Sequence, residues 1–355
     1  MTHVLFVTQV IDADDPTLGF VASWIDALAE RADGVTAIGN EVRGTPALAA
    51  NVRVVSLGKE RGVGRVARGI ALQRAVATSG GHRPVLLAHM CPIYLDITSP
   101  VTAWRRMPTM LWFAHPSVTP ELRLAERLSD VVLTSLPGAY PRPGPKVRVV
   151  GQATDTERIV FDPRAERDPG PLRLVAIGRT SPSKGFDRAI RALAKARAEG
   201  VEATLQIVGP STTEQERAHA AELRDLATAT GLGSNVIFEP GVTPKQVDGV
   251  IRSADVLVNA MVAGSGDKVV FEAMAAGTVP LVANPAFRPV LSGLSIDLAF
   301  DRDDEAMLVD RIVTLSSADP AELDRTRHTL RERVEASHSL RGWADRVGEI
   351  AEGLP

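Results

Sequence analysis

Short apolar segments rich in β-branched residues recur along the whole chain, and amphipathic segments separate many of them. Several, such as PVLLAHM at 84–90, are apolar at nearly every position, as in strands covered on both faces. The expected strands are 3–9, 35–40, 52–58, 84–90, 109–115, 130–135, 147–152, 172–178, 203–209, 235–241, 255–260 and 278–284. The expected helices are 20–32, 62–78, 119–128, 184–199, 213–230, 244–252, 268–276 and 304–316. This alternation predicts a parallel α/β architecture.

The number of expected strands is too large for one sheet, and a polar, proline-bearing stretch at 155–171 divides them into two sets. We therefore predict a linker there, between a first domain at 1–155 and a second at 156–335. The helical segment 336–355 is expected to pack back toward the first domain. The prediction is two doubly wound, Rossmann-like domains facing a cleft, with ligands at the carboxyl ends of the strands.

Composition narrows the class of protein. A hydrophobic fraction of 45% and a charged fraction of 23% over 355 residues are ordinary for a globular protein. The net charge of −3 argues against nucleic acid as a partner. No run approaches the roughly 20 apolar residues of a membrane helix, and MTHVLFVTQV reads as a first strand, so a cytoplasmic protein without a transmembrane segment is expected. Cys91, the single cysteine, excludes an internal disulfide and a multi-cysteine zinc site.

The segment GSGDKVVFEAMAAG at 264–277 is the most informative local pattern. A glycine-bearing loop before a helix presents free backbone N–H groups at the positive end of the helix dipole, which suits a phosphate. Further along the helix, the Glu272 carboxylate can accept hydrogen bonds from hydroxyl groups. A phosphate site beside a hydroxyl site is what a nucleotide sugar requires.

A second cationic pattern opens the second domain, in LVAIGRTSPSKGFDRAI at 174–190. Arg179 follows the end of an expected strand, and Lys184 is expected in the first turn of the next helix. Because the helix dipole disfavours a cation at that position, a bound diphosphate would remove the conflict. Arg179 would supply a forked contact and Lys184 a point charge. The alternative is a surface ion pair between Lys184 and Asp187.

IGR-x4-KG at 177–185 and FEAMAAGTVPLVAN at 271–284 together resemble the retaining glycosyltransferases of family 4 (glycosyl transferases group 1), which have the GT-B fold. Other segments are similar to the same family: TQVIDADDPTLGFVASW (8–24), LWFAHPS (111–117), VGQATDTERI (150–159) and NVIFEPGVTPKQVDGVIRSADVLVNA (235–260). The resemblance implies an acceptor-side first domain and a second domain that binds a nucleotide-diphosphate sugar.

The resemblance also implies roles for individual residues. Arg179 and Lys184 would neutralise the donor diphosphate and help it leave, and Glu272 would bind the ribose hydroxyls. The amides near Val269 and Val270 would contact phosphate, and the backbone at Val242 would read the edge of the base. In the first domain, Gly19 would let its loop approach the phosphate, and His115 would lie beside the transferred sugar.

One position departs from the family pattern. The family carries two glutamates eight positions apart; Glu272 is the second, and Gly264 stands at the place of the first. Recognition of the sugar must therefore differ, and we expect Asp267 or Lys268 to supply part of what Gly264 lacks. The alternative for Asp267 is that it caps the helix 268–276.

Other polar positions have a competing structural explanation. His89 ends an apolar run, and hydrogen-bonded packing is the alternative to a site role. Asp12, Asp14 and Asp15 are more typical of a solvated acidic loop than of an acceptor site. The arginines at 61, 65 and 68 would contact an anionic acceptor or membrane surface, or else form a solvated helix face, which the small intervening residues favour. DAD at 12–14 and DRD at 301–303 are short matches to a metal-binding pattern without further nearby ligands, so no obligate metal or cofactor is expected.

The predicted activity is metal-independent transfer of a sugar, with retention, from a nucleotide-diphosphate sugar to a hydroxyl of a small-molecule or glycan acceptor. A hexosyl- or N-acetylhexosaminyl-transferase is expected. Two alternatives stay open. One is an epimerase or phosphorylase on the same scaffold, and the other is a non-catalytic protein that binds nucleotide sugars. The sequence argues against a dehydrogenase, because no G-x-G-x-x-G follows the first strand.

Overall fold

The computed structural model describes residues 2–44, 47–162, 170–261 and 267–355. It divides into two compact units. The first comprises Met1–Asp155 with Ser337–Pro355, and the second comprises Thr156–Ala336. The predicted linker falls partly on residues 163–169, which lie outside the described residues.

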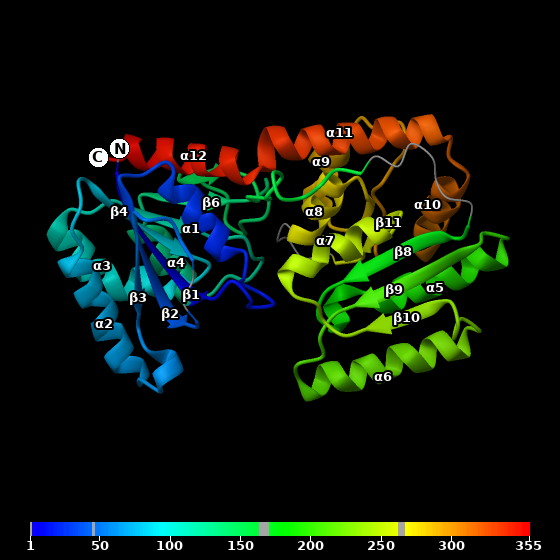
Figure 1. Ribbon diagram of the computed structural model, residues 1–355, viewed down its shortest axis with the longest axis horizontal. Coiled ribbons are helices and arrows are strands. Elements are labelled where there is room, and N and C mark those ends of the chain that lie inside the picture. Colours follow the sequence, from blue (N-terminus) through cyan, green and yellow to red (C-terminus); the bar gives the residue numbers. More distant parts are fainter. Residues whose placement is uncertain (1, 45–46, 163–169, 262–266) are drawn as a thin grey trace. The chain divides into compact units, whose positions relative to one another are not determined.

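The first unit is built on a parallel sheet with the strand order β3-β2-β1-β4-β5-β6-β7 (Figure 1). Its strands are β1 (His3–Ile11), β2 (Gly34–Val42), β3 (Val52–Ser56), β4 (Pro84–His89), β5 (Thr109–Trp112), β6 (Val131–Thr134) and β7 (Val147–Val149). Its helices are α1 (Val21–Ala29), α2 (Arg65–Thr78), α3 (Ile93–Arg105), α4 (Pro120–Leu128) and α12 (Leu340–Gly353), with a 3₁₀ turn at Lys59–Arg61. The order of the strands reverses between β1 and β4, which is the topological switch point of this unit.

Alternate residues of β1 enter two different cores. Leu5 and Val7 join a cluster with Leu72 of α2, Leu95 of α3 and Leu122 of α4. On the other face lies an aromatic cluster, which we define as Phe6, Phe20, Trp24, His89, Trp112 and Trp343. Because α12 supplies Trp343, the end of the chain completes the core built by its first strand and helix.

The second unit repeats the plan with a parallel sheet of strand order β10-β9-β8-β11-β12. Its strands are β8 (Leu172–Ile177), β9 (Ala203–Val208), β10 (Val236–Glu239), β11 (Val256–Asn259) and β12 (Val279–Val282). Its helices are α5 (Phe186–Ala198), α6 (Glu214–Ala229), α7 (Pro244–Ser253), α8 (Lys268–Ala276), α9 (Arg288–Leu291), α10 (Glu305–Ser317) and α11 (Pro320–His338), with 3₁₀ turns at Pro182–Lys184 and Pro285–Phe287. The switch point lies between β8 and β11.

The structure confirms the predicted parallel α/β class and every predicted strand, each to within a few residues at its ends. The helix α3 is not predicted by the sequence pattern, because it contains Pro100 and several Ser and Thr residues. Proline at position 100 cannot donate to the carbonyl of Asp96 four residues earlier. The Ser99 hydroxyl donates to that carbonyl instead, at 2.9 Å, so the helix continues through the proline.

The sequence pattern predicts that Lys184 lies in the first turn of a helix, and this is wrong. Lys184 ends the 3₁₀ turn Pro182–Lys184, and α5 begins only at Phe186. Gly185 separates the two elements because its φ of +66° is not helical. The expected helical segment 336–355 contains the last residues of α11 and all of α12. Within the described residues, no helix combines the length and the apolar character needed to cross a membrane.

Candidate active site

The carboxyl ends of β8 and β11, at the switch point of the second unit, are lined by glycine and small residues. Gly178 follows β8 with a φ of +146°, and a side chain there would meet Cε of Lys184 at 2.7 Å. Gly185 approaches Ala260 so closely that an added Cβ would lie 2.8 Å from the Cβ of Ala260. The Lys184 side chain therefore lies over Gly178, where only a residue without a side chain leaves room.

Lys184 and Asp267 are brought together across this edge of the sheet. The Lys184 ammonium lies 2.7 Å from Oδ2 of Asp267, and the amide of Asn259 donates to the same oxygen at 2.9 Å. Asp267 stands at the N-cap position of α8, but its side chain does not cap the helix. An ammonium group has three N–H donors, so two of those on Lys184 are available for another ligand. The predicted alternative is an ion pair between Lys184 and Asp187, and it is wrong, because Lys184 pairs with Asp267 and Asp187 pairs with Arg188.

Lys268 and Glu272 form a second pair, one turn apart on α8. Glu272 is buried, and so are Val269 and Val270 in the first turn of the helix. Asp248 of α7 lies nearby: burial raises the pKa of its carboxyl group, and the Glu272 carboxylate adds to that rise while Arg158 opposes it. Asp248 of α7 and Glu272 of α8 thus form one electrostatic cluster with the Lys268 ammonium.

Arg179, predicted to bind the donor diphosphate, has a carboxylate partner within the second unit. Its guanidinium lies 3.3 Å from Oε1 of Glu216 in the first turn of α6, and its side chain is 60% exposed. Glu216 also accepts a hydrogen bond of 2.7 Å from the Thr212 hydroxyl, which lowers the pKa of the Glu216 carboxyl group; Arg179 contributes to the same shift. The Arg179 guanidinium is therefore held by an ion pair with Glu216 and is still accessible to a ligand.

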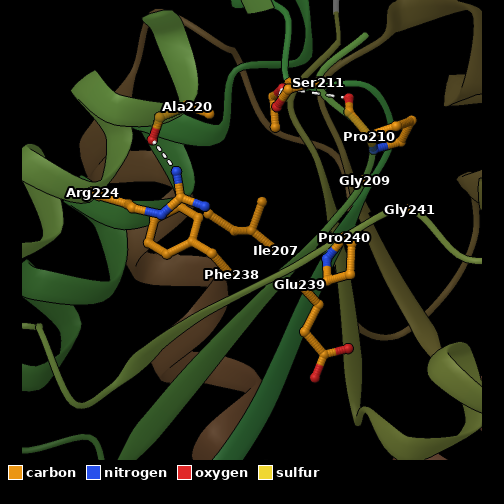
Figure 2. A pocket seen from close by; sticks show the side chains of 11 residues that line it. Ile207, Gly209, Pro210, Ser211, Ala220, Arg224, Phe238, Glu239, Pro240 and Gly241 are labelled. Carbon is orange, nitrogen blue, oxygen red and sulfur yellow. Dashed lines mark hydrogen bonds between the residues drawn. The ribbon is translucent and has the colours of Figure 1, made fainter. Parts of the chain in front are cut away.

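A cavity of about 430 Å³ lies at the carboxyl ends of β9 and β10, beside α6. Figure 2 shows the Arg224 side chain lying against the Phe238 ring, with Pro210 and Pro240 at the strand ends. The guanidinium carbon of Arg224 is 5.1 Å from the centre of that ring. Val242, predicted to read a base edge, follows Gly241 of this cavity and is half-buried. The residues that line this cavity include neither Lys184 nor Asp267, so the two features are distinct parts of the second unit.

The predicted residues of the first unit follow β1 and β5. His115 is exposed beyond β5, and the Ser117 backbone N–H donates to its Nδ1 at 3.1 Å, so the neutral ring carries its proton on Nε2. Gly19 is buried just before α1, and its N–H donates to the carbonyl of Asp15 at 2.9 Å.

The other polar candidates of the first unit have structural partners. His89 is 1% exposed within the aromatic cluster and hydrogen-bonded to Thr8, which favours the packing explanation. The Asp15 carboxylate accepts from two backbone N–H groups of its own loop and pairs with Arg43, so it holds the loop together rather than standing free in solvent as predicted. Arg61 pairs with Glu60.

Among the described residues, no group of three or more His, Cys, Asp and Glu side chains is arranged to hold a metal ion. Gly264 lies outside the described residues.

Asn259, Asp248 and Glu216 are site neighbours that sequence reasoning missed. Asn259 ends the apolar segment DVLVNA, and a polar residue at the carboxyl end of a parallel strand was an available signal. Its Oδ1 is buried without a hydrogen-bond partner among the described residues. Asp248 and Glu216 lie on helices with ordinary amphipathic patterns, so nothing in the sequence distinguishes them from surface carboxylates.

Two doubly wound parallel sheets with glycine-lined strand ends define the GT-B class of folds, and known structures agree. The chain is similar over its whole length to Anabaena Alr3699/HepE, in a crystal structure with UDP and glucose (TM-score 0.74, 15% identity, 100% of each chain). It is also similar to sucrose-phosphate synthase from Thermosynechococcus elongatus (TM-score 0.74, 16% identity, 99% of this chain and 98% of the other). At these identities the likeness shows the fold.

Sequence comparison adds a family model and more similar relatives. Residues 158–333 match the family model described as Glycosyl transferases group 1, and this range covers nearly all of the second unit. A D-inositol 3-phosphate glycosyltransferase from Rhodococcus jostii is 32% identical over 120 residues, which are 33% of this chain and 26% of the relative. A protein of the same name from Rhodococcus opacus is 30% identical over 138 residues, or 30% of its length. The chain thus matches less than a third of the length of these curated relatives.

Proposed function

We propose that the protein is a retaining glycosyltransferase of family 4 that moves a sugar from a nucleotide-diphosphate sugar to an acceptor hydroxyl without a metal ion. The second unit binds the donor and the first unit binds the acceptor. The observation that carries the proposal is the Lys184 ammonium, held by Asp267 over the glycine-lined end of β8 and beside the start of α8.

The donor site follows from the charges at the switch point. The start of α8 favours an anion through its dipole, and the Lys184 ammonium adds a full positive charge beside it. Arg179, tethered to Glu216, offers its exposed guanidinium edge to a second phosphate. Glu272 is buried one turn into α8, where it would accept hydrogen bonds from the ribose. The 430 Å³ cavity near Val242 would take the base.

The chemical step places negative charge on the diphosphate. The bond between the anomeric carbon and the diphosphate oxygen breaks, and its electron pair stays with that oxygen. The acceptor hydroxyl attacks the same face of the sugar, and its proton passes to the departing phosphate. Lys184 and Arg179 stabilise the developing charge, a contribution that is usually the largest in such catalysis.

The remaining roles concern the sugar. His115 would donate from Nε2 to a sugar hydroxyl, because Nδ1 is already occupied by the Ser117 N–H. Gly19 would allow its loop to approach the donor phosphate. Asp267 and Lys268 would take over contacts that the family's first glutamate makes, since both lie at the N-terminal end of α8. We propose that the transferred group is a hexosyl or an N-acetylhexosaminyl residue.

The test is a panel of nucleoside diphosphates and their sugars, including UDP and UDP-glucose, in a thermal-shift assay followed by product analysis. A ligand that binds only the native state raises the melting temperature by mass action. We expect Lys184→Ala and Glu272→Ala to lose most of that shift, and Lys184→Ala to lower turnover by about 100-fold or more. Lys195→Ala is the matched control, because Lys195 pairs with Glu305 on the surface of the same unit.

The same assay separates the alternatives. An isomerised donor without acceptor would indicate an epimerase, and a dependence on inorganic phosphate would indicate a phosphorylase. Binding without consumption of any donor would indicate a non-catalytic protein. Turnover that disappears with EDTA and returns with a divalent cation would contradict the metal-independent mechanism.

A further inference from the structure

A second cavity, of about 430 Å³, lies within the first unit at the switch point of its sheet. Gln9 near the end of β1 and Cys91 just beyond β4 line it, so it opens where the order of the strands reverses. The helices α2 and α3 form its sides through Arg65, Arg68 and Tyr94. In open parallel sheets, ligands bind at this position, outside the carboxyl ends of the strands.

The charge of the cavity comes from Arg65 and Arg68. They are three residues apart on α2, so both reach the same face of the helix. Within the part of the chain that the structure describes, the guanidinium groups of Arg65 and Arg68 form no ion pair and no side-chain hydrogen bond. The neighbouring cations differ, since Arg43 and Lys59 both pair with Glu41. Two like charges on adjacent turns repel each other, and an anion between them would remove that cost.

The helix itself adds to the positive field. Arg65 is the first residue of α2, and its N-cap, Gly64, provides no side chain to accept hydrogen bonds from the first-turn N–H groups. The sequence RVARGIALQRAVAT contains no acidic residue that would offset the dipole. Cations at the N-terminal end of a helix are unfavourable unless an anion accompanies them. Arg65, Arg68 and the helix terminus thus all favour an anionic ligand.

Apart from the two arginines, the polar side chains that line the cavity are uncharged, and the apolar part of its lining comprises Leu57, Leu72, Ile93 and Ile97. The Gln9 amide donates to Sγ of Cys91 at 2.7 Å, and Tyr94 donates weakly to the carbonyl of Thr8 at 3.4 Å. Burial raises the pKa of the Cys91 thiol and of Tyr94, so both stay neutral near pH 7. The Gln9 carbonyl oxygen and the side chain of Asn40 can exchange hydrogen bonds with hydroxyl groups.

We propose that this cavity is the acceptor subsite and that it takes a phosphorylated polyol, with its phosphate between Arg65 and Arg68 and its hydroxyls on Gln9 and Asn40. The inference rests on the proposed function, because it names the acceptor of that reaction. Two guanidinium forks match the two negative charges of a phosphate monoester better than the single charge of a carboxylate. The phosphate would belong either to a soluble molecule or to a lipid headgroup.

The test is calorimetric titration of the full chain with glycerol 3-phosphate and glucose 6-phosphate, beside glycerol and glucose. Phosphatidylcholine vesicles with and without one fifth phosphatidylinositol test the lipid source. All titrations use a Lys184→Ala background, so that phosphate binding at the donor site does not contribute. The variant is Arg65→Gln/Arg68→Gln, and the control is Arg74→Gln on an exposed turn of the same helix.

We expect the double variant to lose about 10- to 100-fold in affinity for the phosphorylated probe, soluble or vesicle-borne, and the control to stay within about twofold. If the double variant also lowers the unfolding midpoint, the single variant Arg65→Gln replaces it, because Arg65 is exposed. We expect that single variant to bind the phosphorylated probe about 10-fold more weakly than the parent. Neutral polyols that bind as tightly as their phosphates, binding unaffected by the arginine changes, or no binding of either phosphate source would overturn the proposal.

The two proposals fail separately. Arginine-dependent binding of a phosphorylated polyol, together with no sugar transfer from any donor by the chain that retains Lys184, would support the cavity and refute the transferase. Transfer to a neutral acceptor at an unchanged rate in the double variant would support the transferase and refute the cavity.

Discussion

At the scale of single residues, the contact between Lys184 and Asp267 is the central feature of the candidate donor site. Asp267 orients the ammonium through a hydrogen bond of 2.7 Å while Asn259 holds the carboxylate. We expect Asp267→Ala to lower kcat/KM by about 10- to 100-fold, because a charge-assisted hydrogen bond to a charged group is lost. Asp267→Asn keeps a hydrogen-bonding oxygen and should retain more activity. Steady-state kinetics check this, and equal activity of the alanine variant and the parent would show that Lys184 needs no such support.

His89 makes the stability of the first unit depend on pH. Burial lowers the pKa of its imidazole to about 3, below the ordinary value of 6.5. The folded state therefore binds the proton less readily than the unfolded chain, so the free energy of unfolding falls as the pH drops from 6.5 toward 3. His338, with a pKa lowered to about 4 by burial, acts in the same direction.

Replacing His89 removes its part of that dependence. We expect His89→Gln to reduce the slope of unfolding free energy against pH, between pH 4 and 6, by about 1.4 kcal/mol per pH unit. His82→Gln, at an exposed position, is the control and should keep the parent slope. Denaturant unfolding followed by tryptophan fluorescence measures it, because all four tryptophans belong to the first unit. Identical slopes for parent and His89→Gln would refute the assignment.

At the scale of elements, the end of α8 is fixed by a glycine that packs against another segment. Gly277 has a φ of +87°, and a Cβ there would lie 2.5 Å from the backbone oxygen of Asp162. We expect Gly277→Ala to destabilise the second unit by about 2–3 kcal/mol, from left-handed strain and the clash together.

Gly231 offers the matched control. It follows α6 with a φ of +75°, but a Cβ there meets nothing within 4 Å. Gly231→Ala should therefore cost only the strain, about 1 kcal/mol. Circular dichroism measures both, and equal losses in the two variants would show that the segment at Asp162 moves away freely.

At the scale of the whole molecule, the final helix of the chain completes the core of the first unit. Trp343 of α12 is 0% exposed and lies 4.5 Å from Trp24, ring centre to ring centre. We expect Trp343→Ala to destabilise the first unit by about 3–5 kcal/mol. Trp104→Ala, the same change at a side chain 77% exposed, should stay within about 0.5 kcal/mol. Fluorescence-detected unfolding compares the two, and similar midpoints would contradict the packing role of α12.

The predictable part of the fold is the part with strong local signals. The strands follow from runs such as PVLLAHM, which are apolar because both faces of a parallel strand are covered. The helix α3 escaped prediction because Pro100 normally ends a helix, and only the tertiary position of Ser99 shows how it continues. The sequence motifs predict three residues of the candidate site, Lys184, Asp267 and Glu272. They do not predict the neighbours Asn259, Asp248 and Glu216.

The order of the residues predicts the parallel α/β class, the succession of strands and the glycine-bearing turns, because burial on both faces and left-handed backbone each favour particular residue types. Tertiary structure alone decided which charges meet. Lys184 pairs with Asp267, Arg179 with Glu216, and Arg65 and Arg68 line a cavity while Arg61 is neutralised by Glu60. The physical reason is that a charged side chain is free to pair with any neighbour in reach, and the neighbours are set by the strand order, which brings distant segments to one edge of a sheet.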